Sequence, residues 1–152
     1  MLYSDPLAFF LTWTTYGSWL PGDGRGWTQK RGGKRRPDPV RRRDALARQT
    51  ETGVRLGPAQ RTLVEAVIQD HAARRGWTLH AVNVRTNHVH VVVTAPGYEP
   101  KLVGEQFRAW GTRRLRSLDP DRRNWWTEGG NAQLLFTEED VAEAVRYVLE
   151  AQ

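Results

Sequence analysis

Residues 77–94 decide the fold. They read Trp-Thr-Leu-His-Ala-Val-Asn-Val-Arg-Thr-Asn-His-Val-His-Val-Val-Val-Thr. β-branched and aromatic residues dominate two runs, 77–85 and 88–94, and such runs are typical of strands. Thr86 and Asn87 lie between the runs and predict a tight turn. The stretch therefore predicts two consecutive strands, of which the second has the strongest strand pattern in the chain.

The segments on either side complete the order strand, helix, strand, strand, helix, strand, helix. Further strands are predicted at 7–15 and 133–136, and helices from Pro58 to Gly76, at 101–117, and from the N-cap residue Thr137 onward. Val103, Phe107 and Trp110 are expected on the inner side of the middle helix. This order predicts an α+β fold of the ferredoxin-like, split βαβ type, with an antiparallel sheet and helices on one face.

The length of 152 residues predicts a single domain, 1–152, with a long basic loop at about 21–57. The sequence contains no cysteine, which excludes disulfide scaffolds, cysteine-ligated zinc and thiol nucleophiles. We find neither an apolar run long enough to span a membrane nor a secretory signal. A cytoplasmic protein is expected, associated with the nucleoid if the source is prokaryotic.

Positive charge is concentrated in one segment. The whole chain has a formal net charge of +6, but residues 25–48 hold ten basic and two acidic residues, whereas the remainder is slightly acidic. A local cluster of this kind indicates a polyanionic partner, most often a nucleic acid. Trp19 and Trp27 lie beside the cluster, and aromatic rings among arginines form stacking platforms for unpaired bases. The alternative is a solvated loop rich in glycine and proline.

His88 and His90 are two residues apart on the strongest predicted strand. Side chains alternate along a strand, so both imidazoles lie on one face while Val89, Val91 and Val93 fill the other. Two adjacent imidazoles can occupy two positions on a divalent ion. Alternatively, they are polar side chains that face solvent.

The four tyrosines differ in their predicted surroundings. Tyr3 is close to the N-terminus, and Tyr16 and Tyr98 are next to turns. Tyr147 lies on the last predicted helix at the edge of its apolar stripe, which predicts a ring half packed against the sheet with an outward hydroxyl. Such a position also suits an ordinary amphipathic boundary tyrosine.

Several stretches resemble the single-tyrosine transposases that carry an HUH motif (histidine, hydrophobic residue, histidine). Residues 77–93, with the core Asn-His-Val-His, resemble the motif itself, and residues 105–115 resemble the helix that follows it. The stretch Ala-Val-Arg-Tyr-Val-Leu-Glu at 144–150 resembles the tyrosine helix. Residues 7–23 are similar to the N-terminal strand and loop of the REP-associated branch. The resemblance covers nearly the whole chain except 25–57.

The resemblance implies an HUH-endonuclease fold and a mechanism. His88 and His90 would hold Mg²⁺ or Mn²⁺ on the scissile phosphate of single-stranded DNA. Tyr147 would attack the phosphorus and leave a 5′-phosphotyrosine and a free 3′-hydroxyl. A hydroxyl would later attack this linkage and rejoin the DNA without ATP. The implied partner is hairpin-forming single-stranded DNA, bound by a monomer or a homodimer, with no membrane partner.

The third metal ligand departs from the family pattern. The family often has asparagine or glutamine four residues after the tyrosine, where this chain has Ala151. Gln152 or Glu150 is expected to serve instead. The expected DNA contacts come from the basic loop, its neighbouring tryptophans and the helix at 101–117, namely Arg35, Arg36, Arg41, Arg42, Arg43, Trp19, Trp27 and Arg108.

Two other functions compete with strand transfer. The first is a domesticated single-stranded nucleic-acid-binding protein on the same fold with little or no catalysis. The second is an unrelated α+β metal protein whose basic loop serves solubility. The presence of His88, His90 and Tyr147 together favours the enzyme.

Overall fold

Four antiparallel strands form the main sheet of the protein. The computed structural model describes residues 5–18, 27–29, 33–35 and 51–150. The strands are β1 (Ala8–Thr14), β4 (Thr78–Val84), β5 (His88–Thr94) and β6 (Asn131–Leu135), and they lie in the order β4-β5-β1-β6. This is the ferredoxin-like order, and it confirms the predicted α+β class with an antiparallel sheet.

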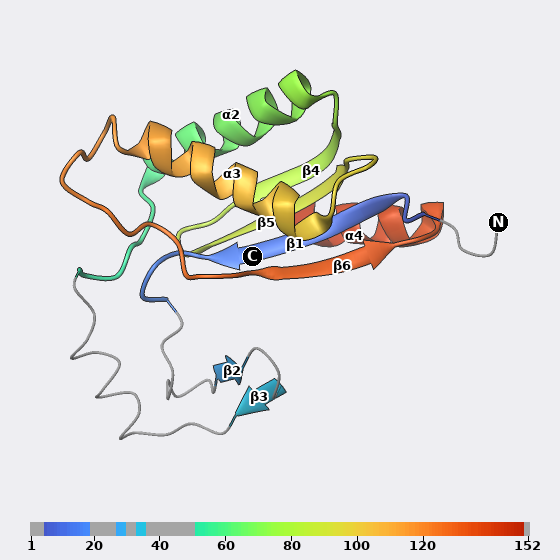
Figure 1. Cartoon of the computed structure of the whole chain (residues 1–152), viewed down its shortest axis with the longest axis horizontal. Helices are drawn as coiled ribbons and strands as arrows, with labels where there is room; N and C mark the ends of the chain where they lie inside the picture. Colours follow the sequence, from blue (N-terminus) through green and yellow to red (C-terminus); the bar gives the residue numbers. More distant parts are fainter. Residues whose placement is uncertain (1–4, 19–26, 30–32, 36–50, 151–152) are drawn as a thin grey trace.

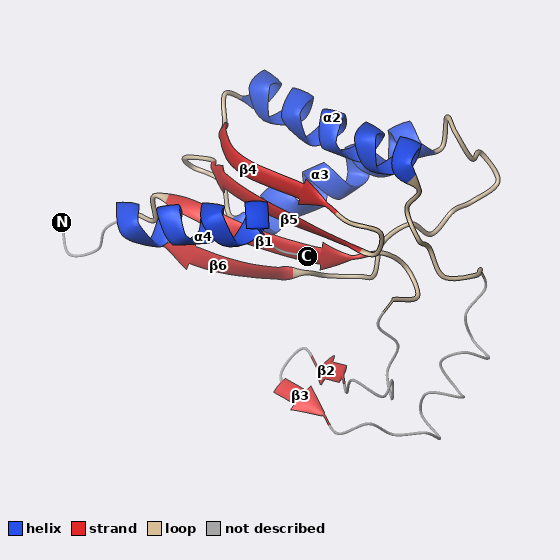
Figure 2. Ribbon diagram, turned by 180° about the vertical axis from the view of Figure 1, so that it is seen from behind, coloured by secondary structure: helices blue, strands red, loops and turns tan. Residues whose placement is uncertain are grey.

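The three described helices cover both faces of this sheet. α2 (Pro58–Arg75) and α3 (Pro100–Leu115) pack side by side on one face, whereas α4 (Glu138–Glu150) lies on the other (Figures 1 and 2). The expected placement of all helices on one face is therefore wrong in this detail. Five consecutive residues of β5, Val89 to Val93, are buried, so both faces of the sheet must be covered.

Two apolar clusters fill the two layers. Between the sheet and the α2–α3 pair lie Phe9, Leu11, Trp13, Val89, Val91, Val93, Val103 and Phe107, among others. The smaller cluster under α4 contains Ala8, Ala81, Val92, Leu135, Ala144 and Val148. The alternation of side chains along β1 and β5 divides these residues between the clusters, and it places His88 and His90 on the α4 side.

The helix ends follow the sequence signals. Pro58 opens α2, and Gly76 ends it in the left-handed conformation with a φ of 74°. The Thr137 hydroxyl accepts a hydrogen bond from the Asp140 amide at 3.0 Å and caps α4. None of the helices in the described ranges is long and apolar enough to cross a membrane.

The segment predicted as a basic loop contains regular structure. β2 (Trp27–Gln29) and β3 (Gly33–Arg35) pair antiparallel as a separate two-stranded sheet. At the other end of the segment, Val54 and Leu56 are buried in the larger apolar cluster. The last part of the expected loop is therefore packed against the core, because these two apolar side chains are buried before α2 begins.

Candidate active site

The two histidines lie side by side on the α4 face of the sheet. Their ring centroids are 4.7 Å apart and the rings are nearly perpendicular, at 79°. His90 is 7 % exposed and His88 is half-buried. The two rings are thus packed against each other and largely buried, so they are not two solvated side chains on an open strand.

Tyr147 comes to the same place from α4. Its ring centroid is 5.7 Å from that of His90, with the ring planes at 86°. Phe10 of β1 contacts both rings, at 5.8 Å from each. Tyr147 is nevertheless 56 % exposed. One side of the phenol is therefore held by aromatic contacts, while the residue stays accessible to a large ligand.

Hydrogen bonds fix the orientation of the histidine rings. His88 Nδ1–H donates to the Asn87 side-chain oxygen at 2.8 Å, because a carbonyl oxygen can only accept. His90 Nδ1 bonds the Thr12 hydroxyl at 3.2 Å. Both Nδ1 atoms are therefore engaged, and neither Nε2 atom is hydrogen-bonded to a residue in the part of the chain that the structure describes. Metal-binding histidines are typically oriented by such bonds on the second ring nitrogen.

The surroundings keep both imidazoles neutral. Burial lowers the pKa of His90 to about 4, with further lowering by the neighbouring His88 and by Arg85. The pKa of His88 is lowered mainly by burial and also by Arg85. A neutral imidazole is the form that binds a metal ion, so the pair is in the right protonation state near pH 7.

The donor set fits a divalent cation in part. Two neutral imidazoles can take two positions on a divalent cation, with oxygen donors at the remaining positions. Within residues 5–18 and 51–150, no third histidine or carboxylate joins them in a group that could hold a metal ion. Glu150 thus does not complete such a group, and Gln152 lies outside the described residues.

α4 is tied to the sheet beside the histidines. The Asn83 side-chain amide donates to the Val148 carbonyl oxygen at 2.9 Å. Asn83 is the β4 residue paired with His90, and Val148 follows Tyr147 directly. This bond therefore ties the tyrosine end of α4 to β4, the strand next to the one that carries the histidines.

Sequence reasoning missed Phe10, Thr12 and Asn83. The first two alternate along the predicted strand 7–15, but only the strand register shows that they face His90. The one visible signal for Asn83 was a polar amide between two valines, Val82 and Val84.

Of the expected DNA contacts, only Arg108 is described with its side chain. Its guanidinium carbon lies 5.6 Å from the Trp13 ring, on the face away from the histidines, and burial lowers its pKa despite the opposing effect of Glu105. A Cβ at Gly130 would come within 3.1 Å of this guanidinium, so glycine makes room for it. Trp27 and Arg35 are cross-strand partners of β2 and β3. Trp19, Arg36, Arg41, Arg42 and Arg43 lie outside the described residues.

The fold is similar to that of two solved structures. No family model and no curated protein matches the chain. Among solved structures, it is similar to a REP-associated tyrosine transposase bound to a REP hairpin, with a TM-score of 0.58, 14 % identity, and coverage of 97 % of this chain and 67 % of that one. It is also similar to a protein from Deinococcus radiodurans R1 described as a candidate transposase, with a TM-score of 0.55, 17 % identity, and coverage of 98 % and 93 %.

Proposed function

We propose that this protein cleaves and rejoins single-stranded DNA through a 5′-phosphotyrosine intermediate on Tyr147. The observation that carries the proposal is the meeting of Tyr147 with His90 and His88 on one sheet face of one chain. The transposase fold supports it, since two solved transposase-like structures share the arrangement of elements. Fold alone does not specify chemistry, so the argument rests on these three side chains.

Each of the three side chains has a defined task. The Nε2 atoms of His88 and His90 would hold a divalent ion, which neutralises part of the phosphate charge and favours the phenolate form of a nearby tyrosine. Tyr147 loses its phenolic proton to solvent, and its oxygen forms a bond to phosphorus. The bond from phosphorus to the 3′-oxygen breaks, and that oxygen leaves and takes up a proton. The reverse attack by a 3′-hydroxyl restores the diester and the free phenol.

The partner is single-stranded DNA. The ten basic residues at 25–48 supply the charge for a polyanion. One similar structure is bound to a REP hairpin, which motivates hairpin-forming substrates as probes. Since Tyr147 contacts His90 of its own chain, a monomer has these three groups together, which favours a monomer over a dimer that exchanges its tyrosine helices.

A second function, nucleic-acid binding without catalysis, has one observation in its favour. In the described part of the chain no third metal-ligating histidine or carboxylate joins the two histidines. A weakly held ion would give slow chemistry or none. The basic segment would bind DNA in either case.

One gel experiment separates these functions. The full chain is incubated with labelled hairpin-forming single-stranded DNA and Mn²⁺, and the products are resolved with and without denaturation. A covalent adduct that survives denaturation and disappears with EDTA supports strand transfer. A shift in native gels without an adduct supports the binding protein. If neither an adduct nor a shift is seen, both functions are overturned.

A further inference from the structure

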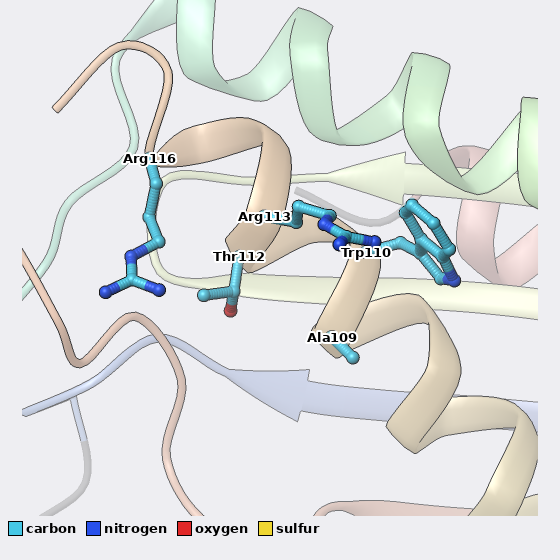
Figure 3. A pocket seen from close by; sticks show the side chains of 5 residues that line it. All are labelled: Ala109, Trp110, Thr112, Arg113 and Arg116. Atoms are coloured by element: carbon cyan, nitrogen blue, oxygen red, sulfur yellow. The ribbon is translucent and has the colours of Figure 1, made fainter. Parts of the chain in front are cut away.

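The surface of α3 carries a hollow of about 430 Å³, on the opposite face of the sheet from the histidine pair. Its lining residues are Ala109, Trp110, Thr112, Arg113 and Arg116 (Figure 3). Four of them, at 109, 112, 113 and 116, recur at helical spacing and so share one side of the helix. Because α3 and α4 lie on opposite faces of the sheet, a group bound here does not occupy the site formed by Tyr147 and His90.

Trp110 is an exposed but fixed side chain. It was expected inside the core, yet it is 40 % exposed. Its ring lies against that of the buried His71, with centroids 6.0 Å apart and an angle of 32°. His71 is itself held, since its Nε2–H donates to the Gln106 side-chain oxygen at 2.7 Å. The ring is thus anchored from below before any ligand arrives, which reduces the entropy lost on binding.

Two arginines line the hollow together with this ring. The Arg113 guanidinium carbon lies 4.8 Å from the Trp110 ring centroid, and Arg116 borders the same hollow. Within the described ranges, neither forms an ion pair with a carboxylate. Residues 112–124 hold five arginines against two aspartates. The surface therefore combines a flat aromatic platform with a local positive charge.

We propose that this hollow is a second binding site for single-stranded DNA, separate from the cleavage site. An unpaired base stacks on the Trp110–Arg113 pair, and Arg116 contacts an adjacent phosphate. A tryptophan with an arginine over it suits a planar base, and guanidinium groups that form no ion pair with a described carboxylate suit phosphate. The proposal relies on the proposed function only for the choice of DNA as the nucleic acid, and it needs none of the cleavage chemistry.

The stacking part is tested by fluorescence anisotropy of a labelled oligothymidine with the full chain. Trp110→Ala is expected to weaken binding at least about fivefold, the lower end for removal of one base–aromatic stack. Leu102→Ala, at another exposed apolar position of α3, should bind like the wild type. Trp110→Phe keeps a ring and should restore most of the affinity, which guards against a folding defect. With an abasic oligonucleotide of equal length, the wild type and Trp110→Ala should become equal.

The charge part is tested through the salt dependence of the same binding. Arg116→Gln should reduce the slope of log affinity against log salt by about 0.7, the value for one phosphate on a single strand. Arg114→Gln removes the same charge from a neighbouring exposed position that does not line the hollow, and it should change the slope less.

Three results would overturn the site: equal oligothymidine affinity in Trp110→Ala and Leu102→Ala, a Trp110 effect that persists with abasic DNA, or equally tight binding of a polyglutamate peptide. If the adduct forms but Trp110→Ala binds normally, the proposed function stands and this site is wrong. If binding depends on Trp110 but no adduct forms, this site stands and the proposed function is wrong.

Discussion

His88 and His90 show how burial prepares a side chain for chemistry. A solvated histidine is partly charged near pH 6.5 and would repel a cation. On β5 the two rings are held by Asn87 and Thr12 and kept neutral by partial burial. The strand thus presents two oriented, neutral imidazoles, which is the form that a metal ion would require.

The proposed metal site gives the first prediction. His88→Ala and His90→Ala should each abolish Mn²⁺ binding in calorimetry, since removal of either ring leaves a single nitrogen donor. His80→Ala is the matched control, because His80 is an exposed histidine of β4 that bonds the Thr94 hydroxyl at 2.7 Å. Unchanged Mn²⁺ affinity in His88→Ala would show that His88 is not a ligand of the metal ion.

The lowered pKa of His90 gives a pH prediction in metal-free buffer. The unfolded chain has a histidine pKa of about 6.5, whereas the folded value is about 4, so protons bind more tightly to the unfolded state. The His90 contribution should therefore reduce the free energy of unfolding as pH falls from about 6.5 to about 4. Above this window it should have no effect.

Urea denaturation with EDTA at a series of pH values measures this effect. Carboxyl groups also titrate near the lower limit, so the quantity of interest is the difference between wild type and His90→Gln. The difference in the free energy of unfolding should change between about pH 6.5 and about pH 4, because the variant lacks the titrating imidazole. If the free energies of unfolding of the wild type and His90→Gln change with pH in parallel, the pKa of His90 is not lowered.

At the scale of elements, the strands were predictable and the placement of the last helix was not. The runs 77–85 and 88–94 gave β4 and β5 within a residue or so, because β-branched residues and a short turn mark them. The apolar stripe of α4 tells which side of the helix is buried, but not which face of the sheet it covers. That depends on the burial of Val92 and Ala81 under the helix, which a period-two pattern does not reveal.

Trp110 illustrates the same limit within α3. Its large apolar side chain and its spacing from Val103 and Phe107 favoured the core. The core beneath α3 is already filled by Phe107 and by Trp13, whose ring stacks on it at 6.3 Å. The ring of Trp110 is therefore displaced toward solvent at the edge of α2. Packing volume, which single-sequence patterns do not record, decided its position.

The bond between Asn83 and α4 gives a prediction at this scale. Asn83→Ala removes the donor to the Val148 carbonyl and should slow adduct formation severalfold, because Tyr147 is then less well positioned. Mn²⁺ affinity should stay near that of the wild type, and the stability cost should be about 1 kcal/mol.

His80→Ala, on the same strand, is the control for this variant. The rate of adduct formation is measured with saturating DNA, so that weaker binding does not imitate poor positioning. Equal rates in Asn83→Ala and His80→Ala would show that the bond has no positioning role.

In the whole molecule, the two faces of the sheet have different contents. The α4 face holds the histidines and the tyrosine, while the α2–α3 face holds the larger core and the Trp110 hollow. The position of the two histidines on the same face could be predicted from the alternation of side chains along a strand. Tyr147 joined them in the sequence analysis only through the family resemblance. The third metal ligand could not be predicted, because the usual position is Ala151.

The basic segment gives a prediction for DNA binding by the whole molecule. Replacing Arg41, Arg42 and Arg43 with glutamine should weaken binding of single-stranded DNA and flatten its salt dependence, by about 0.7 in slope for each phosphate that is no longer neutralised. A variant with the same charge change at the exposed Arg55, Arg74 and Arg75 is the control. Equal salt slopes in the two variants would mean that the segment is only solvated.

The central claim is that Tyr147 is the nucleophile. Tyr147→Phe removes one oxygen from a mostly exposed ring, so it should leave folding, Mn²⁺ affinity and DNA binding near wild type. It should nevertheless abolish the covalent adduct. Tyr98→Phe is the matched control, since Tyr98 packs against Trp77 on the other face of the sheet and should form the adduct normally.

The most direct measurement is the position of the DNA on the protein. Nuclease and trypsin digestion of the purified adduct, followed by mass spectrometry, locates the residual nucleotide. Trypsin cleaves after Arg146, and the stretch 147–152 that follows contains no serine, threonine or second tyrosine. The account predicts a phosphate-linked nucleotide on the peptide that begins with Tyr147. A nucleotide on any other tyrosine, or on a serine or threonine, would contradict it.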